Sequence, residues 1–407
     1  MLVAVPWSRV IALWRASGRT PGTVALYSYW AKRYVHHCST EGRVPLACLS
    51  QVAVAKYSGC EIPIARRRRA GRVVDARAVT HAVHALWCAL VALGYRLPPW
   101  RDPKPGRRLT PLVRSFVEFR LHHHGIAPST GPADAHFATL FLRWIRRRRR
   151  TVAQTRIADI DDFVAACAKR WAPKTVAGLC SSLRAFLRFL RATGRIATDL
   201  ATSVVGPRIR WGDRPPRALP WADVRRILRA IDVRTRFGRR DYALFLMMAT
   251  YGMGAGEVLG LRLEDFDWQN RTVRVRRPKT GTVTILPLLA PVARAVASYL
   301  RRERPAHARD RSVFVSHRLP HAALSGSSAI RHRLAQHAAA AGVSAEFLGT
   351  HVFRHTHATR QIESGVAPKI VGDVLGHRRP ESTSAYVRGA ILKLRNVSLP
   401  VPRGVVS

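Results

Sequence analysis

Apolar residues recur at helical spacing along most of this chain. The segment 241–250 is almost entirely apolar, which predicts a helix inside a hydrophobic core. Alternating apolar and polar residues over 272–276 and 282–286, on either side of a turn with Gly281, predict one β-hairpin. The pattern therefore predicts a mainly α chain with a small antiparallel β-sheet, an α+β fold class. The clearest helical stripe lies within 173–193 and consists of Val176, Leu179, Leu183, Phe186, Leu187 and Leu190.

Two proline-rich, charged stretches divide the chain. Residues 98–108 read PPWRDPKPGRR and residues 205–218 read VGPRIRWGDRPPRA, and both compositions are typical of linkers. The predicted order is a helical region over 1–105, a second helical unit over 106–205, a linker over 206–218, an α+β domain over 219–398 and a tail over 399–407.

The charge of the chain is strongly positive. It contains 69 Lys and Arg residues against 24 Asp and Glu residues, for a formal net charge of +45. Such an excess favours a polyanionic partner, most simply nucleic acid, and a basic protein of the membrane surface is the competing interpretation. The sequence shows no uninterrupted apolar run of transmembrane length and no clear signal peptide, so we expect a cytoplasmic protein without a membrane partner.

The six cysteines lie far apart and form no CxxC pair. Reduced, buried thiols are therefore expected in place of disulfides or a zinc site. No metal and no other cofactor is predicted.

Candidate chemistry is concentrated in the stretch 350–389. A helix is predicted there, capped by Thr350 and ended by Gly365, and a second helix from Pro368 to Gly376.

This stretch contains His351, Arg354, His377 and Tyr386. The first two are three positions apart, so they share one face of the first predicted helix, and the other two follow the end of the second. The set suits a phosphodiester, because cations hold the anion, imidazoles move protons and a phenol can attack phosphorus.

The order of these residues resembles the tyrosine recombinase (phage integrase) family. The match consists of H-x-x-R-H-T, then L-G-H, and then a tyrosine nine positions after that histidine. The resemblance implies a helical, SAM-like core-DNA-binding domain joined by a linker to an integrase-type catalytic domain. It also implies metal-free DNA cleavage and rejoining through a 3′-phosphotyrosine link, within a homo- or hetero-tetramer of related recombinases on double-stranded DNA.

The resemblance implies a role for each residue. Tyr386 would be the nucleophile, and Arg354 would clamp the non-bridging phosphate oxygens. His351 would take the tyrosine proton or bind the phosphate, His377 would donate to the same phosphate, and Lys279, in the hairpin turn, would protonate the leaving 5′ oxygen. Taken singly, each has a structural alternative, such as a packed tyrosine, a surface salt bridge, a core histidine or a turn lysine.

The helix predicted over 173–193 and the residues that follow it resemble the end of the family's helical core-binding domain. Its basic residues are predicted to bind DNA phosphates, with a merely solvated helix face as the alternative. They lie off the apolar stripe, at Lys174, Arg184, Arg188 and Arg191.

One position departs from the family. The family has its first catalytic arginine in a pattern such as G-[LM]-R-x-[SG]-E-[LV], whereas residues 252–258 read GMGAGEV, with Gly254 in place of the arginine. Three explanations stay open: a weakened enzyme kept for DNA binding, replacement of the charge by another arginine such as Arg262, or an Arg→Gly change in this sequence.

The leading hypothesis is a bacterial site-specific recombinase or integrase of a mobile element, associated with DNA in the cytoplasm. The alternative is a DNA-binding homologue with inefficient strand transfer because of Gly254. A type IB topoisomerase and a basic packaging protein are more distant alternatives. The N-terminal region over 1–105 is interpreted as an additional DNA-binding domain.

Overall fold

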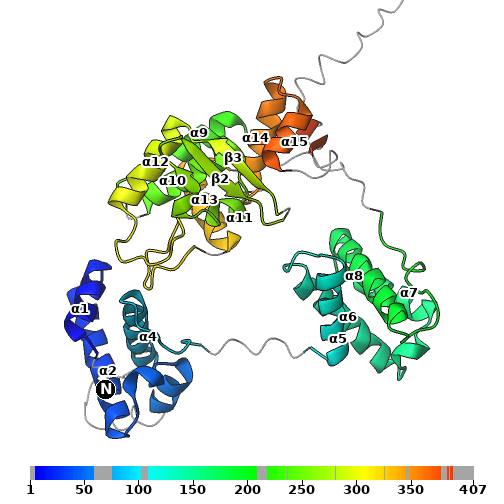
Figure 1. Ribbon diagram of the computed structural model, residues 1–407, viewed down its shortest axis with the longest axis horizontal. Coiled ribbons are helices and arrows are strands. Elements are labelled where there is room, and N and C mark those ends of the chain that lie inside the picture. Colours follow the sequence, from blue (N-terminus) through cyan, green and yellow to red (C-terminus); the bar gives the residue numbers. More distant parts are fainter. Residues whose placement is uncertain are drawn as a thin grey trace, which may run out of the picture. The chain divides into compact units, whose positions relative to one another are not determined.

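Two compact units make up the computed structural model, Met1–Asp102 with Arg214–Ser407 and Pro103–Asp213 (Figure 1). The structure describes residues 5–58, 76–101, 109–208, 218–235, 237–279, 281–324, 326–344, 348–376, 383–384 and 386–387. None of the helices within these ranges is long and apolar enough to span a lipid bilayer.

The N-terminal region is helical, as predicted. Trp14 and Tyr34 are buried in its core, and the indole of Trp14 donates to the carbonyl of Ala85 at 3.1 Å. Thr20 caps the second helix by accepting from Thr23 N at 3.3 Å, directly before a proline in the first turn. The elements are α1 (Trp7–Ala16), α2 (Pro21–Thr40), η1 (Pro45–Cys48) and α4 (Ala76–Ala92).

The second unit is a helical bundle around the predicted stripe. The six apolar stripe residues of α8 are all buried, which confirms the helix expected from their spacing. Asp134 of α6 is also buried, and it accepts hydrogen bonds from Ser182 of α8 and Arg120 of α5. The elements are α5 (Pro111–His123), α6 (Gly131–Arg147), η2 (Val152–Gln154), α7 (Ile157–Ala168) and α8 (Pro173–Ala192).

The C-terminal region is α+β, and the predicted fold class is confirmed. Its sheet has the antiparallel order β1-β2-β3, with Val273 opposite Leu286 and Val275 opposite Thr284. The two valines are fully buried, whereas alternate residues of the same strand are exposed. The two-residue strand β1 is too short to appear in the alternation of the sequence. The strands are β1 (Phe266–Asp267), β2 (Thr272–Arg276) and β3 (Val283–Pro287).

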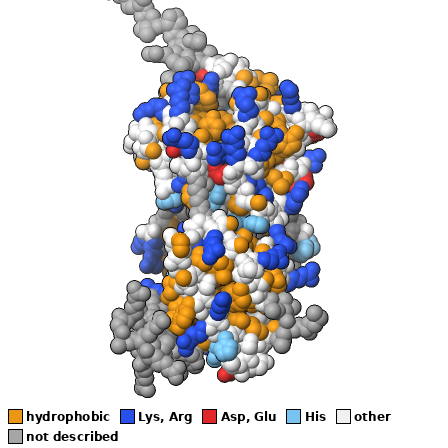
Figure 2. All heavy atoms as spheres, turned by 90° about the vertical axis from the view of Figure 1, so that its left-hand side faces the viewer, with side chains coloured by type: hydrophobic (Ala, Val, Ile, Leu, Met, Phe, Trp, Pro, Cys, Tyr) orange, Lys and Arg blue, Asp and Glu red, His pale blue; other side chains and the backbone are white. Residues whose placement is uncertain are grey.

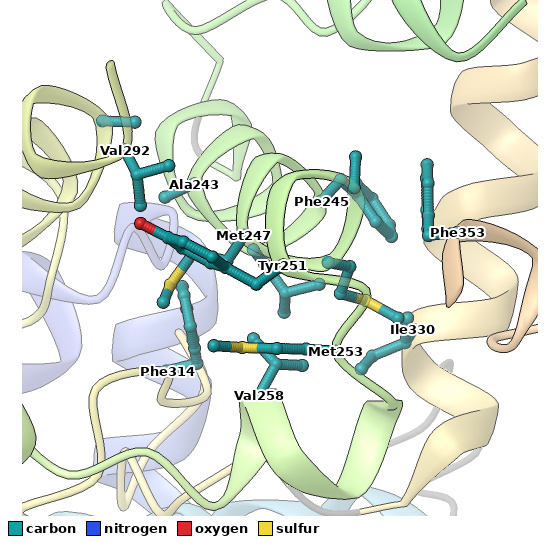
Figure 3. Close-up of a cluster of buried hydrophobic side chains, with 14 of the residues drawn as sticks. Ala243, Phe245, Met247, Tyr251, Met253, Val258, Val292, Phe314, Ile330 and Phe353 are labelled. Carbon is teal, nitrogen blue, oxygen red and sulfur yellow. The ribbon is translucent and has the colours of Figure 1, made fainter. Parts of the chain in front are cut away.

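Helices pack around α10, the apolar segment predicted to lie in the core. Figure 3 shows Phe245 of α10 facing Phe353 of α14, with ring centroids 5.6 Å apart. Tyr251 donates to the carbonyl of Pro287 at 2.8 Å and so ties the end of α10 to β3. The helical elements are α9 (Trp221–Arg229), α10 (Gly238–Tyr251), α11 (Ala255–Leu259), η3 (Leu263–Asp265), α12 (Ala290–Arg302), α13 (Ser327–Ala340), α14 (Val352–Glu363) and α15 (Pro368–Leu375).

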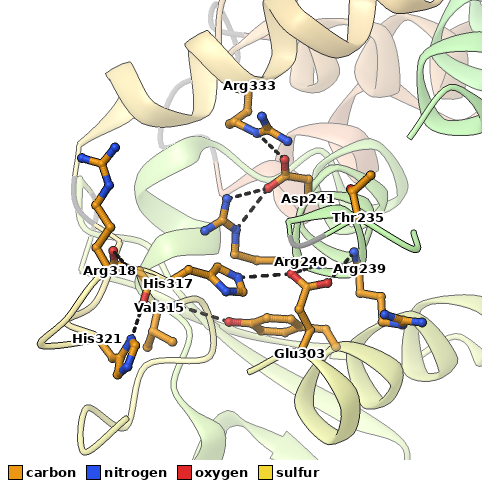
Figure 4. Close-up of polar contacts among 12 residues, drawn as sticks. Thr235, Arg239, Arg240, Asp241, Glu303, Val315, His317, Arg318, His321 and Arg333 are labelled. Carbon is orange, nitrogen blue, oxygen red and sulfur yellow. Dashed lines mark hydrogen bonds and ion pairs between the residues drawn. The ribbon is translucent and has the colours of Figure 1, made fainter. Parts of the chain in front are cut away.

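A buried polar network, here called the α10 network, holds the start of α10 (Figure 4). Asp241, 2% exposed, accepts from Arg240 Nη2 at 2.8 Å and Arg333 Nε at 2.5 Å, and its Oδ2 lies 3.0 Å from His337 Nε2. Glu303 accepts from the backbone of Arg239 at 2.8 Å. The helix dipole favours a carboxylate such as Asp241 in the first turn of α10. Because Arg333 and His337 lie on α13 and Glu303 directly follows α12, the network fastens α10 to both helices.

Candidate active site

The site is built on the start of α14 and the end of α15. Val352 and Phe353, in the first turn of α14, are buried and fix this helix to the core, whereas His351 directly before it is exposed. His351 occupies the N-cap position and makes no side-chain capping bond. The helix therefore begins one residue later than predicted, and the expectation that Thr350 caps it is wrong.

The predicted second helix is confirmed, and α15 ends at Gly376 as expected. Gly376 has a left-handed φ of +67°. A Cβ there would lie 2.2 Å from Cδ of Arg277, so this position requires glycine for its conformation and for the passage of that side chain.

Arg354 lies at the centre of the site. Its Nη1 lies 3.1 Å from both carboxylate oxygens of Glu257, on α11, and its Nη2 donates to the carbonyl of Leu375. The last carbonyls of a helix carry partial negative charge, so the end of α15 and Glu257 together hold one guanidinium.

A second guanidinium, which was not predicted from the sequence, joins this cluster. Arg277, 3% exposed, donates to Glu257 Oε1 at 2.9 Å and to the carbonyl of Val374. Burial lowers the pKa of Arg277, the charge of Glu257 raises it and the charge of Arg354 lowers it. The only signal in the sequence was its place in the turn, two residues before Lys279.

We name Glu257, Arg277 and Arg354 the site cluster. Arg262, named above in one of the three explanations for Gly254, pairs with Glu264 at 3.6 Å beside η3. The guanidinium that shares Glu257 with Arg354 is that of Arg277.

Position 254 faces the site cluster. The backbone N–H of Gly254 donates to Glu257 Oε2 at 2.9 Å. A Cβ on Gly254 would lie 3.9 Å from the Glu257 carboxylate and 3.9 Å from Cε1 of His351, which is ordinary contact distance. A side chain at this position would therefore start beside His351 and the cluster without a clash.

Tyr386 lies against Arg354. Its side chain is 5% exposed and packs with apolar residues of α14 and α15, including Ile362 and Leu375. Burial raises the pKa of the Tyr386 phenol, and the positive charge of Arg354 and a hydrogen bond with it offset part of the rise. The ring centroid of His355 lies 5.4 Å from that of Tyr386. The phenol is thus protonated at neutral pH and in contact with the central cation.

His351 and Lys279 are within electrostatic reach of each other. His351 is exposed as a residue, but the surrounding protein removes part of the water from its ring. This desolvation lowers the pKa of His351. The charges of Lys279 and Arg354 lower the pKa further, against the opposing charge of Glu257. His351 is therefore neutral at neutral pH and can accept a proton. Lys279 is exposed in the hairpin turn.

The remaining predicted residues are placed in different ways. His377 lies outside the described residues. On α8, Lys174 and Arg188 are exposed, whereas Arg184 donates to the carbonyl of Val204 at 3.1 Å and Arg191 pairs with Asp199 at 3.0 Å. Two of the four basic side chains are thus engaged within their own unit.

Within the described part of the chain, no group of three or more His, Cys, Asp and Glu side chains is placed to hold a metal ion. The described cysteines, including the buried Cys38 and Cys180, are free thiols.

Known proteins resemble this chain in sequence. The family model described as the phage integrase family matches residues 217–391. "Putative integrase/recombinase y4gC" of Sinorhizobium fredii is 42% identical over 176 residues, which cover 43% of this chain and 89% of the relative. "Putative integrase/recombinase y4rA" of the same organism is 37% identical over 254 residues, which cover 62% of this chain and 61% of the relative.

Solved structures share the fold at low sequence identity. The site-specific recombinase XerH bound to palindromic difH substrate aligns with a TM-score of 0.55 and 14% identity, over 70% of this chain and 93% of that one. A lambda integrase tetramer bound to a Holliday junction aligns with a TM-score of 0.51 and 17% identity, over 75% and 86%. The residue order around Arg354 and Tyr386, the α+β fold and these relatives agree, and the chain belongs to the phage integrase family of tyrosine recombinases.

Proposed function

We propose that this protein is a site-specific DNA recombinase that cuts and rejoins strands through Tyr386. The observation that carries the proposal is the contact between the Tyr386 phenol and Arg354, beside a carboxylate that does not balance the two guanidiniums of the cluster. A cluster of this kind attracts an anion and places it next to a nucleophile.

The reaction is a phosphoryl transfer. The Tyr386 oxygen attacks the scissile phosphorus, the phenolic proton goes to His351, and Arg354 binds the non-bridging oxygens. The new P–O bond to tyrosine replaces the bond to the 5′ oxygen, which leaves with a proton from Lys279. One phosphate ester bond replaces another in this step, so the bond energy is retained in the phosphotyrosine. A 5′ hydroxyl of a second strand can therefore reverse the step without ATP.

The pKa directions support this division of labour. A buried phenol with a raised pKa holds its proton until a base takes it, and a neutral imidazole is such a base. The guanidinium of Arg354 offers a planar fork of donors that matches phosphate oxygens.

DNA is the substrate that the surface favours. On the face drawn in Figure 2, Lys and Arg side chains are spread among apolar ones and acidic side chains are few. Each neutralised phosphate releases counterions, so a formal charge of +45 supports strong, salt-dependent binding. We further propose that Lys174 and Arg188 contact the DNA backbone and that the protein acts as a tetramer for a mobile element.

The test is a nicked DNA substrate that traps the covalent intermediate. We expect a protease-sensitive protein–DNA adduct with the wild-type chain and none with Tyr386→Phe, which retains the ring and loses the nucleophile. An adduct of equal yield in both proteins would refute the proposal.

A second candidate is a DNA-binding homologue with weak strand transfer. It is favoured by Gly254, which presents no side chain to the site although a Cβ would meet no clash there. Sequence-specific DNA binding with no Tyr386-dependent adduct would identify this second function.

A further inference from the structure

The buried Arg277 carries out no chemical step of the reaction proposed above. It projects from the β2–β3 connection, and all three of its guanidinium nitrogens are engaged. Nη1 donates to Glu257 Oε1 at 2.9 Å, Nη2 donates to the carbonyl of Val374, and Nε donates to Thr284 Oγ1 at 3.4 Å. With only 3% of its surface exposed, the side chain cannot itself reach a DNA phosphate.

The contacts of Arg277 join three separate elements. Glu257 belongs to α11, Val374 to the last turn of α15, and Thr284 to β3. Lys279 follows Arg277 by two residues in the same connection. The side chain also crosses directly over Gly376, where no Cβ could fit. Arg277 therefore connects the hairpin of Lys279 to the end of α15. The carbonyl of Leu375, which accepts from Arg354, lies at that same helix end.

Glu257 is shared between the two guanidiniums. Its Oε1 lies 2.9 Å from Arg277 Nη1 and 3.1 Å from Arg354 Nη1, and its Oε2 lies 3.1 Å from the same Arg354 nitrogen. Glu257 is half-buried, and two cations offset its charge. When one cation is removed, the carboxylate charge acts on the other cation without that offset. Without Arg277, the full charge of Glu257 would fall on Arg354, and less positive charge would face Tyr386 and a bound phosphate.

We propose that Arg277 is a positioning residue that keeps Arg354 available to Tyr386 and to the scissile phosphate by taking a share of Glu257. The proposal deepens the recombinase function and rests on it for the phosphate. The link between Arg277, Glu257, Arg354 and Tyr386 can be measured without turnover.

The first measurement is the ionisation of residue 386 in the full-length protein. The chain has nine tyrosines, and 3-fluorotyrosine incorporation with fluorine NMR reports each phenol, with Tyr386→Phe to assign the resonance. We expect Arg277→Gln to raise the pKa of the residue-386 phenol by about one unit, the effect of one charge at close range. Glu257→Gln should lower it, and the double variant should lie close to wild type.

The control is Arg274→Gln. Arg274 lies on β2 with its side chain exposed, so this variant removes one positive charge from the same hairpin but no contact of the site cluster. An unchanged pKa in Arg277→Gln, or equal shifts in Arg277→Gln and Arg274→Gln, would overturn the proposal. If Arg277→Gln fails to fold, the downward shift in Glu257→Gln decides, and its absence refutes the proposal.

The second measurement is single-turnover cleavage of the nicked DNA. A displaced catalytic group costs up to about 10²-fold, so we expect Arg277→Gln to cleave about 10–100-fold more slowly than wild type while DNA affinity is retained. Fluorine shifts as expected, together with no Tyr386-dependent adduct in wild type, would support the link to Arg354 and refute the recombinase function. Normal cleavage by a folded Arg277→Gln would refute the positioning role.

Discussion

Two arginine–carboxylate clusters lie in the C-terminal α+β region, and their arrangements suit different roles. In the α10 network, the guanidiniums of Arg240 and Arg333 both bond to Asp241. A second carboxylate, Glu303, accepts from the backbone N–H groups of Arg239 and Arg240 at the start of α10. In the site cluster, Arg277 and Arg354 share the single carboxylate of Glu257.

The two clusters also lie at opposite ends of their helices, the start of α10 and the end of α15. Asp241 lies in the first turn of α10, where the helix dipole favours an anion, and the ring of Phe237 lies 5.2 Å from Arg240 and 5.3 Å from Arg333. The site cluster uses the last carbonyls of α15, which favour cations without cancelling a full charge. The same residue types thus form a structural ion-pair network in one place and the proposed phosphate-binding site in the other.

The largest expected effect is on stability. Asp241→Asn leaves the 8%-exposed side chain of Arg240 without its carboxylate, and removing one partner of a buried ion pair costs about 3–5 kcal/mol. Denaturant unfolding should show this loss. As a control, Asp223→Asn breaks the more exposed pair with Arg226 and should cost about 0–1 kcal/mol. Equal losses in the two variants would contradict the proposed difference.

The corresponding change in the site cluster should act on rate. Arg354→Gln removes the proposed donor to the phosphate, so we expect strand cleavage to fall by about 10²–10³ or more. Arg360→Gln, on the same helix, removes an exposed arginine that stacks on Trp221 at 4.1 Å, and it should leave cleavage unchanged. A similar loss of rate in both variants would show that the effect is not specific to the site cluster.

A third prediction concerns the missing side chain. Gly254→Arg adds a guanidinium where a Cβ meets only ordinary contacts, beside His351 and Glu257, and we expect cleavage to rise by about tenfold or more. The measurement is adduct formation on the nicked substrate. Gly256→Arg, at a nearby glycine with open space, is the matched control for added charge. No gain at 254 would mean either that the site already compensates for the absent arginine or that activity is lost for another reason.

The fourth prediction is a pH dependence. The pKa of His351 is lowered from its ordinary value of 6.5. A base must have the neutral ring, so cleavage should decline only when the pH falls below 6.5. The α10 network responds to acid differently. Burial raises the pKa of Asp241, but its hydrogen bonds and arginine partners outweigh burial and lower it overall. Its stabilising effect is therefore present above the unfolded pKa and is lost as pH falls through the folded value, below 3.8.

The pH dependence of cleavage and the pH dependence of stability can be separated by experiment. Single-turnover cleavage and thermal unfolding, measured across the same pH range, should lose activity first and stability only in stronger acid. Simultaneous loss of both near pH 6.5 would contradict the assignment.

The smallest expected effect lies on α8. Arg188→Gln should weaken DNA binding almost uniformly across sequences and reduce the slope of log affinity against log salt by about one. Arg184→Gln removes the bonds to Val204 and should act mainly on stability. Salt titrations of both variants distinguish the roles, and an equal change of slope would contradict them.

Much of the fold could be predicted from local patterns. The stripe of α8, the hairpin around Gly281 and the glycine at the end of α15 were read correctly because periodicity and left-handed glycines are local properties of the chain. The cap of α14 was misplaced at Thr350 because helix ends vary by a residue or two with tertiary context.

The sequence by itself determined the family, through the spacing of His351, Arg354 and Tyr386, and the excess of positive charge. The tertiary structure alone decided which charges are paired. Arg277 and Arg262 look alike in the sequence, yet one shares Glu257 with Arg354 and the other pairs with a neighbour beside η3. Burial and partners are set by contacts between residues far apart in the chain, and these contacts leave no periodic trace in the sequence.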